Sequence, residues 1–425
     1  MLAPRILSHA LQRLALGALV LTLLGCSAAA VVPVPPPVAT RSAAPESSRL
    51  NLVRATVDAW LKAARTGDRV GFDRLISDRD PSFGDRARLL YGNLSALPLT
   101  WLQMRMDPTV FGLSDARRRL LGPSAWVQRG TISWRLSGDA AEVEHQVSLT
   151  FLETSGEVKI AGTIDEPPDS VPAQQPSWWL GPVTASESDG VTVVAGSGQV
   201  LDRWTKLAKD ALADVREELP AGLGTSWNDR VVIEVPATER NFTSVLGKPA
   251  GSYASIAAVT HPAGTTGDAI RIVVNPKAAQ LNSSDLQSVL EHEMVHVATR
   301  SPNSPAPIWA EEGLAEWVSL RAHPDQRSEG TDELLARVRG DGAPNSLPSD
   351  RQFQAGARNL QVAYAEAWLA CRYIADQYSE AQLARFYGEL DRGSSVDQAS
   401  RSTLQLSEAA LTAGWRAYLV RLAQY

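Results

Sequence analysis

The chain has 425 residues, which is more than one ordinary hydrophobic core needs and indicates two domains. Apolar residues make up 44% of it, a normal share for a globular protein, and its formal net charge is -6. This negative charge and the absence of a basic stripe argue against nucleic-acid binding. Two cysteines, Cys26 and Cys371, are too few for a disulfide framework, and the apolar helical run around Cys371 predicts a buried core residue.

The first 25 residues have the form of a targeting segment. Two arginines and no acidic residue accompany an apolar run over residues 14–24, which suits a signal-peptide core and is short for a membrane span. The run ends in Leu-Leu-Gly-Cys26, which resembles the bacterial lipobox. The resemblance implies that Cys26 is lipidated and that the mature protein is extracytoplasmic and anchored to the bacterial cell membrane. The alternative is an ordinary signal peptide cut near Ala28 or Ala30.

A tether and a first domain are expected after this segment. Residues 26–48 are rich in alanine, proline and serine and have no periodic apolar face, which predicts an extended tether. The first domain is expected over residues 49–199. Apolar residues at helical spacing predict a helix in residues 49–68, which Gly67 ends. Alternating patterns predict strands in three segments, residues 125–136, 140–153 and 156–164, and a further pair within residues 176–196.

A helix followed by an antiparallel sheet predicts an α+β fold for this first domain. The order of its elements is similar to that of the nuclear-transport-factor-like (cystatin-like) family, and the likeness covers about 150 residues. The resemblance implies the helix-plus-antiparallel-sheet fold of that family. We find no catalytic pair of residues in this part of the sequence.

A second domain, also α+β, is expected over residues 200–425. It opens with an amphipathic helix in residues 201–219 and continues with a small set of β-rich segments. These segments are residues 230–236, 253–261 and 269–276. Helices then dominate to the end of the chain, and they are expected over residues 284–299, 307–322, 361–378, 380–390 and 407–423.

The first of these later helices contains His292-Glu293-Met294-Val295-His296. Its start is marked by Ser284-Asp285-Leu286-Gln287, which has the form of a capping box. Residues four apart lie one turn apart on one face of a helix, so both imidazoles can bind a single ion. Glu293 lies beside them, where it can take a proton from a water that the metal activates. This spacing therefore predicts a zinc site with His292 and His296 as ligands and Glu293 as the general base.

A second motif supplies the third ligand of the predicted site. The segment SPNSPAP breaks the first helix, and WAEEGLAEWV then forms a second helix with Glu312 sixteen positions after His296. A catalytic zinc ion takes three protein ligands and keeps one position open. Glu312 completes this set, with Glu311 as the alternative, and Glu316 one turn later is expected to fix the orientation of a ligand imidazole.

These two motifs resemble those of the gluzincin metallopeptidases, in which the third ligand is a glutamate on a following helix. The likeness covers residues 200–425. The gap between His296 and Glu312 is shorter than in the large aminopeptidases of this clan, and their Gly-Ala-Met-Glu-Asn segment is absent. The closer resemblance is to the smaller peptidase-MA-like domains, which implies a zinc-dependent peptidase that acts on a peptide or protein substrate.

The resemblance also implies a residue that stabilises the oxyanion and a strand that holds the substrate. Tyr364 opens the helix at the position where members of the clan use a tyrosine or histidine, with Tyr373 and Tyr378 as alternatives. An edge strand in residues 255–260 is expected to pair with an extended peptide. A competing hypothesis is an inactive zinc-binding lipoprotein that works as a binding or assembly module, and a second is a structural lipoprotein without metal.

Overall fold

The computed structural model describes residues 46–167, 173–251, 253, 256–323, 326–354 and 357–425. The predicted signal peptide, the lipidation site Cys26 and most of the tether therefore lie outside the described residues. Within the described part of the chain, no helix combines the length and apolarity that a membrane crossing requires.

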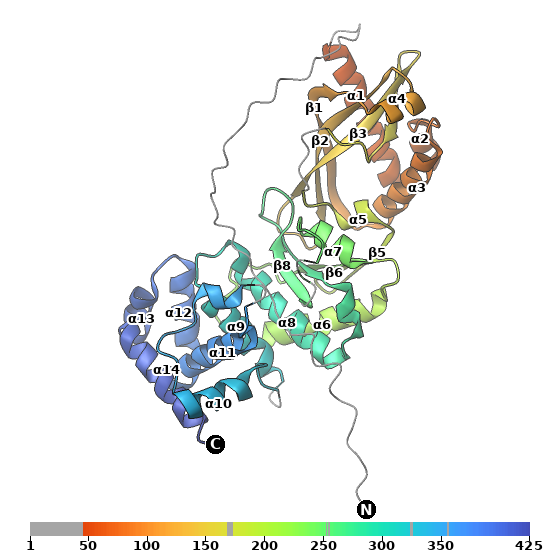
Figure 1. Ribbon diagram of the computed structural model, residues 1–425. Coiled ribbons are helices and arrows are strands. Elements are labelled where there is room, and N and C mark those ends of the chain that lie inside the picture. The colour runs from red at the N-terminus through yellow and green to blue at the C-terminus, as the bar shows by residue number, and fades with distance from the viewer. Residues whose placement is uncertain (1–45, 168–172, 252, 254–255, 324–325, 355–356) are drawn as a thin grey trace, which may run out of the picture. The chain divides into compact units, whose positions relative to one another are not determined.

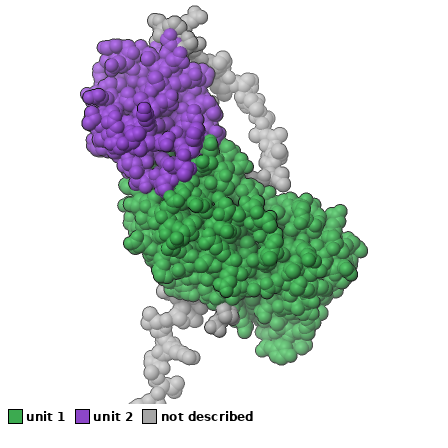
Figure 2. All heavy atoms as spheres, turned by 180° about the vertical axis from the view of Figure 1, so that it is seen from behind, with its two compact units in different colours: residues 1–20, 135–143, 174–425 green, residues 21–134, 144–173 purple. Residues whose placement is uncertain are grey.

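The described chain forms two compact units (Figure 2). We call residues 46–134 and 144–173 the N-terminal unit, and residues 135–143 and 174–425 the C-terminal unit. The expected domain boundary at 199/200 was wrong, because strands predicted within residues 176–196 join the sheet of the C-terminal unit. Both units mix helices and strands, and the predicted α+β class is confirmed.

The N-terminal unit packs helices against a four-stranded sheet of order β1-β2-β3-β4 (Figure 1). Its helices are α1 (Glu46–Thr66), α2 (Arg69–Arg74), α3 (Pro81–Ala96) and α4 (Asp115–Leu121), and its strands are β1 (Leu99–Phe111), β2 (Ala125–Leu136), β3 (Val143–Thr154) and β4 (Glu157–Gly162). The predicted helix ends at Gly67, whose φ of 73° suits a residue without a side chain. Most of its apolar stripe is buried, at Val53, Val57, Trp60 and Leu61, whereas Leu52 is 42% exposed. Helices α2, α3 and α4 and strand β1 were not predicted.

The C-terminal unit begins with a mixed five-stranded sheet of order β5-β6-β7-β9-β8. Its strands are β5 (Val183–Ser188), β6 (Val191–Gly196), β7 (Val231–Val235), β8 (Ala258–Pro262) and β9 (Ile270–Val274). Strands β6, β7 and β9 are parallel, and their near-continuous valine and isoleucine content is typical of buried parallel strands. Strand β8 is antiparallel to β9 and lies at the edge of the sheet.

Helices make up most of the rest of the C-terminal unit (Figure 1). They are α5 (Ser177–Leu180), α6 (Leu201–Glu218), α7 (Glu239–Val245), α8 (Ser283–Thr299), α9 (Ile308–Arg321), α10 (Thr331–Asp341), α11 (Leu360–Gln377), α12 (Glu380–Asp391), α13 (Val396–Leu404) and α14 (Glu408–Leu422). One hydrophobic core joins the sheet to most of these helices, with Ile233 and Ile272 from the sheet, Leu290 from α8 and Leu314 from α9, while α7 packs in a smaller cluster with Tyr253 and Val273. The five helices expected after residue 283 are confirmed, and each of their ends lies within one residue of the predicted end. Helices α7, α10 and α13 were not predicted.

A buried carboxyl group on α11 predicts a pH-dependent stability. Glu366 is 7% exposed, and burial raises its pKa from 4.5 to about 7, although Gln352 and Arg337 oppose this shift. Between these two values the unfolded chain loses the proton while the folded protein keeps it, so the free energy of unfolding falls as the pH rises. We expect Glu366→Gln to raise the free energy of unfolding at pH 8 by about 1–3 kcal/mol and to change it little at pH 4. Urea denaturation at pH 4 and pH 8 measures the change in the free energy of unfolding. An equal change at the two pH values would contradict the prediction.

Candidate metal centre

Helix α8 carries the predicted motif in the middle of the core. The side chain of Asn282 accepts a hydrogen bond from the amide of Asp285 at 3.0 Å, so the N-cap is Asn282 and the capping box expected at Ser284 was wrong. From Ser288 to Thr299 every residue of α8 is buried, which is typical of a helix that other elements surround on all sides. The helical period then places His292 and His296 on one face.

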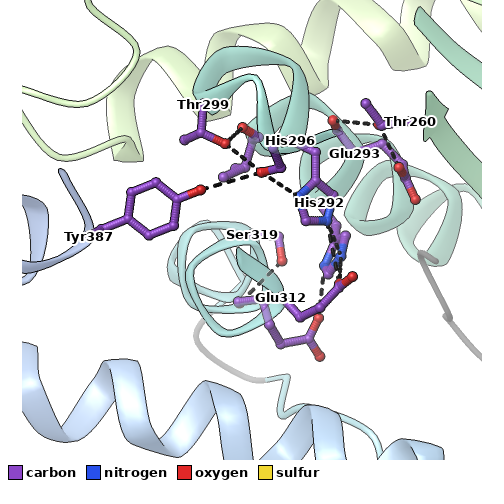
Figure 3. A network of polar contacts seen from close by, with 11 residues as sticks. Thr260, His292, Glu293, His296, Thr299, Glu312, Ser319 and Tyr387 are labelled. Atoms are coloured by element: carbon purple, nitrogen blue, oxygen red, sulfur yellow. Dashed lines mark hydrogen bonds and ion pairs between the residues drawn. The ribbon is translucent and has the colours of Figure 1, made fainter. Parts of the chain in front are cut away.

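The chain reverses direction after α8 and returns as α9. Arg300 ends α8 in a left-handed conformation with φ of 56°, and a single 3-10 turn, Ser301–Asn303, follows it. Pro307 then precedes the first turn of α9. Helix α9 packs against both α8 and α11, and it presents Glu312 toward the two histidines of α8 (Figure 3).

Three predicted ligands converge on one point. The Nε2 atom of His292 lies 3.1 Å from Nε2 of His296 and 3.0 Å from Oε2 of Glu312. The same Glu312 oxygen lies 3.4 Å from Nε2 of His296 (Figure 3). His296 and Glu312 have no solvent exposure, and His292 has 5%. The structure therefore brings together the three side chains that the sequence predicted.

This arrangement fits the coordination of zinc. A four-coordinate zinc ion with bonds of about 2.0–2.1 Å holds neighbouring ligand atoms about 3.3 Å apart. The three separations between Nε2 of His292, Nε2 of His296 and Oε2 of Glu312 are 3.1, 3.0 and 3.4 Å. Two imidazoles and one carboxylate are also a donor set that catalytic zinc uses. The residues present thus fit a zinc ion in both spacing and chemistry.

The charges of the cluster also favour a bound cation. Burial by itself lowers the pKa of His292, but its hydrogen bonds to Glu312 and Glu316 outweigh burial and raise it to about 10. Burial raises the pKa of Glu312, yet the two histidines outweigh this effect and lower it to about 2. The buried carboxylate of Glu312 is therefore stabilised by positive charge beside it. Either a proton on a neighbouring histidine or a divalent ion supplies this charge.

Each ligand imidazole has a partner on its other ring nitrogen. Nδ1 of His292 lies 3.1 Å from Oε2 of Glu316, as the sequence predicted. Since a carboxylate only accepts, Nδ1 of His292 carries a proton in this contact. Nδ1 of His296 lies 3.1 Å from Oγ of Ser301, a residue that the sequence analysis missed. The sequence feature that could have predicted Ser301 is a hydroxyl side chain directly after the end of the motif helix.

Ser301 belongs to a small network of hydroxyl groups behind His296. Its Oγ atom lies 2.8 Å from Oγ1 of Thr299 and 3.4 Å from the hydroxyl of Tyr387 on α12 (Figure 3). Ser301 is fully buried, and its contacts orient the hydroxyl that faces His296. Tyr387 was also missed, because nothing in the local pattern brings α12 next to the motif helix.

The predicted base, Glu293, faces the edge strand of the sheet. Oγ1 of Thr260 on β8 donates to Oε2 of Glu293 at 2.6 Å, and it lies 3.0 Å from the backbone oxygen of the same residue (Figure 3). Burial raises the pKa of Glu293, while the two neighbouring histidines and Thr260 oppose this rise. The expected strand at residues 255–260 is β8, Ala258–Pro262, and Ser255 lies outside the described residues.

Tyr364 lies beside the cluster, whereas its two alternatives lie elsewhere. Its ring centroid is 6.2 Å from that of His292. Burial, the charges of nearby carboxylates and a hydrogen bond with Glu312 raise the pKa of its phenol well above the usual value. Tyr373 and Tyr378 instead contact each other edge to face, with ring centroids 6.1 Å apart. The phenol of Tyr364 therefore stays protonated and able to donate a hydrogen bond next to the ligands.

Glu311, the alternative third ligand, is buried outside the cluster of His292, His296 and Glu312. Burial and the negative charge of Glu312 raise its pKa to about 9. Its side chain is therefore neutral at neutral pH, whereas a carboxyl group that binds a metal ion must be deprotonated. The geometry thus selects Glu312, because adjacent residues on a helix point about 100° apart.

No protein-family model matches the chain, and no curated protein is significantly similar to it. The function of the protein is therefore inferred from the geometry and chemistry of the site itself.

Proposed function

We propose that the C-terminal unit is a zinc-dependent peptidase of the gluzincin type, carried by a lipoprotein that Cys26 anchors outside the cytoplasm. The observation that carries this proposal is the convergence of His292, His296 and Glu312, with Glu293 on the next position of the same helix. When bound, zinc supplies a Lewis acid that polarises a carbonyl group and activates a water molecule.

In this proposal each residue has a distinct task. Glu293 takes a proton from the attacking water and passes it to the leaving amine. Thr260 holds the carboxylate of Glu293 in place through its 2.6 Å hydrogen bond. The protonated phenol of Tyr364 donates to the oxyanion as it forms. The support for this last role is its position beside His292 and Glu312.

The edge strand supports a peptide as the substrate class. Strand β8 has β9 as its sheet neighbour and lies at the edge of the sheet. An extended peptide that pairs with such an edge is held by main-chain hydrogen bonds, which do not depend on its sequence. Thr260 of this strand donates a hydrogen bond to Glu293 of α8, so a peptide on β8 would lie next to the proposed base.

The metal site is tested by a pair of isosteric variants on neighbouring positions. After dialysis against metal-free buffer, we expect the zinc content of the parent chain to exceed that of His296→Ala by about one ion per chain. Glu312→Gln should weaken zinc binding at least about tenfold, because the charged ligand is lost. Glu311→Gln should leave zinc content unchanged, because the group is already neutral and lies outside the cluster. Elemental analysis and zinc titration measure both effects.

Activity is tested on the same proteins with a library of quenched fluorescent peptides. Cleavage by the parent that stops with a chelator and returns with zinc would support the peptidase. Equal zinc content in the parent and in His296→Ala would overturn the metal site. Zinc binding without cleavage of any peptide would favour the alternative, a zinc-binding lipoprotein that acts as a binding or assembly module.

A further inference from the structure

A second group of ligating side chains lies elsewhere on the same helix. Asp214 of α6, Glu291 of α8 and His323, which follows α9, place one ligand atom each within 4.8 Å of one another. Glu291 precedes the ligand His292, but neighbouring positions of a helix point about 100° apart. The two groups therefore use different faces of α8.

The contacts within this group resemble those of the first cluster in length. Nε2 of His323 lies 3.0 Å from Oε1 and 2.9 Å from Oε2 of Glu291. Oδ2 of Asp214 accepts a hydrogen bond from Nε2 of Gln287 at 2.7 Å. Ligand atoms of one zinc ion stand about 3.3 Å apart. The spacing of the three side chains thus admits an ion among them with small movements.

The charges of this group are compatible with a bound cation. The side chain of Glu291 has no solvent exposure, and that of His323 has 19%. Among the described residues, neither Asp214 nor Glu291 forms an ion pair with a lysine or arginine. Two carboxylates so close together repel each other unless a proton or metal ion lies between them, and one imidazole supplies at most one charge.

The surrounding contacts hold the backbone that carries His323 next to α8 before any ligand binds. Oγ of Ser288 donates to Oε1 of Gln326 at 3.2 Å, and Nε2 of Gln326 donates to Oγ of Ser284 at 3.1 Å. The backbone N–H of Gln326 also donates a hydrogen bond to the backbone oxygen of His323 at 2.8 Å. These bonds fasten the segment that carries His323 to α8. A site built in this way loses little entropy when an ion binds.

We propose that Asp214, Glu291 and His323 form a second binding site, for a divalent transition-metal ion such as Zn²⁺. One imidazole and two carboxylates suit zinc and match its double charge, and water completes the coordination of this half-exposed site. The ion ties α6, α8 and the end of α9 together. Because α8 and α9 carry the first cluster, the second ion stabilises the framework of the first site without taking part in its chemistry.

The test is a zinc count on the full chain and four variants after dialysis against metal-free buffer. The variants are His323→Ala, Asp214→Asn, His296→Ala and the double variant His296→Ala/His323→Ala. We expect the parent to exceed His323→Ala and Asp214→Asn by about one zinc ion, and His296→Ala to exceed the double variant by the same amount. Asp210→Asn, one turn earlier on α6 and half-buried, is the matched control and should bind as the parent does.

A thermal readout separates metal loss from misfolding. Added Zn²⁺ should raise the unfolding midpoint of His296→Ala and leave that of the double variant unchanged, because a ligand stabilises only a protein that binds it. Circular dichroism checks that each variant is folded. If His323→Ala and Asp214→Asn retain the zinc content of the parent, the group is a hydrogen-bonded cluster and the proposal fails. This outcome is independent of the first site, whose failure would appear in His296→Ala alone.

Discussion

Glu293→Gln is expected to retain zinc and to lower kcat/KM for peptide hydrolysis by about 10²- to 10⁴-fold, the usual contribution of a general base. An amide has nearly the same shape as a carboxylate and still accepts the hydrogen bond from Thr260, so the fold and the metal ligands should be undisturbed. The amide of glutamine cannot accept the proton of the attacking water. The loss should therefore appear in kcat, with little change in KM.

The measurement uses the best peptide from the library screen, with zinc content determined on the same samples. Glu311→Gln is the matched control, since it makes the same change at a buried glutamate outside the cluster and should keep the parent rate. A Glu293→Gln protein that hydrolyses peptide at the parent rate would show that Glu293 is not the base.

Gly313→Ala is expected to lower the free energy of unfolding by about 1–3 kcal/mol or more, although alanine is the better helix former by about 1 kcal/mol. A Cβ atom at this position would lie 2.4 Å from the carbonyl oxygen of Ala367 and 2.9 Å from Sγ of Cys371, both on α11. The nearest of these atoms belongs to a helix backbone, which cannot rotate away as a flexible side chain can. Either α9 or α11 must shift.

The same substitution in α10 provides the control. A Cβ atom on Gly340 would meet nothing within 4 Å, so Gly340→Ala should raise the free energy of unfolding by about 0.5–1 kcal/mol. Urea denaturation of the two variants should give changes of opposite sign. Because Glu312 is the neighbour of Gly313, we also expect weaker zinc binding in Gly313→Ala. Equal stability of the two variants would mean that α9 and α11 do not approach as closely as described.

Local patterns predicted the first half of the candidate metal centre well. A helix repeats every 3.6 residues whatever surrounds it, so His292 and His296 had to share a face once α8 formed. The break at Pro302 and Pro305 likewise required two helices, not one, before Glu312. The burial of Cys371 at 2% exposure also follows from its apolar helical run, and it is confirmed.

Other features depended on contacts between distant segments. The pattern in residues 176–196 predicted two strands, but it could not tell which sheet they join, and β6 pairs in parallel with β7. A strand pattern specifies which side chains face a core, whereas its partner is chosen by the whole chain. For this reason the boundary between the two units was misplaced.

The sequence by itself determined that His292 and His296 stand one helical turn apart and that Glu293 is next to His292. Only the tertiary structure decided between Glu311 and Glu312, because the close approach of α9 to α11 at Gly313 sets the rotation of α9 about its axis. It also brought Thr260 from β8 to Glu293 and Ser301 to His296. The physical reason is that helix periodicity acts over four residues, whereas the environment of each ligand is made by side chains from separate elements that meet only when the core is packed.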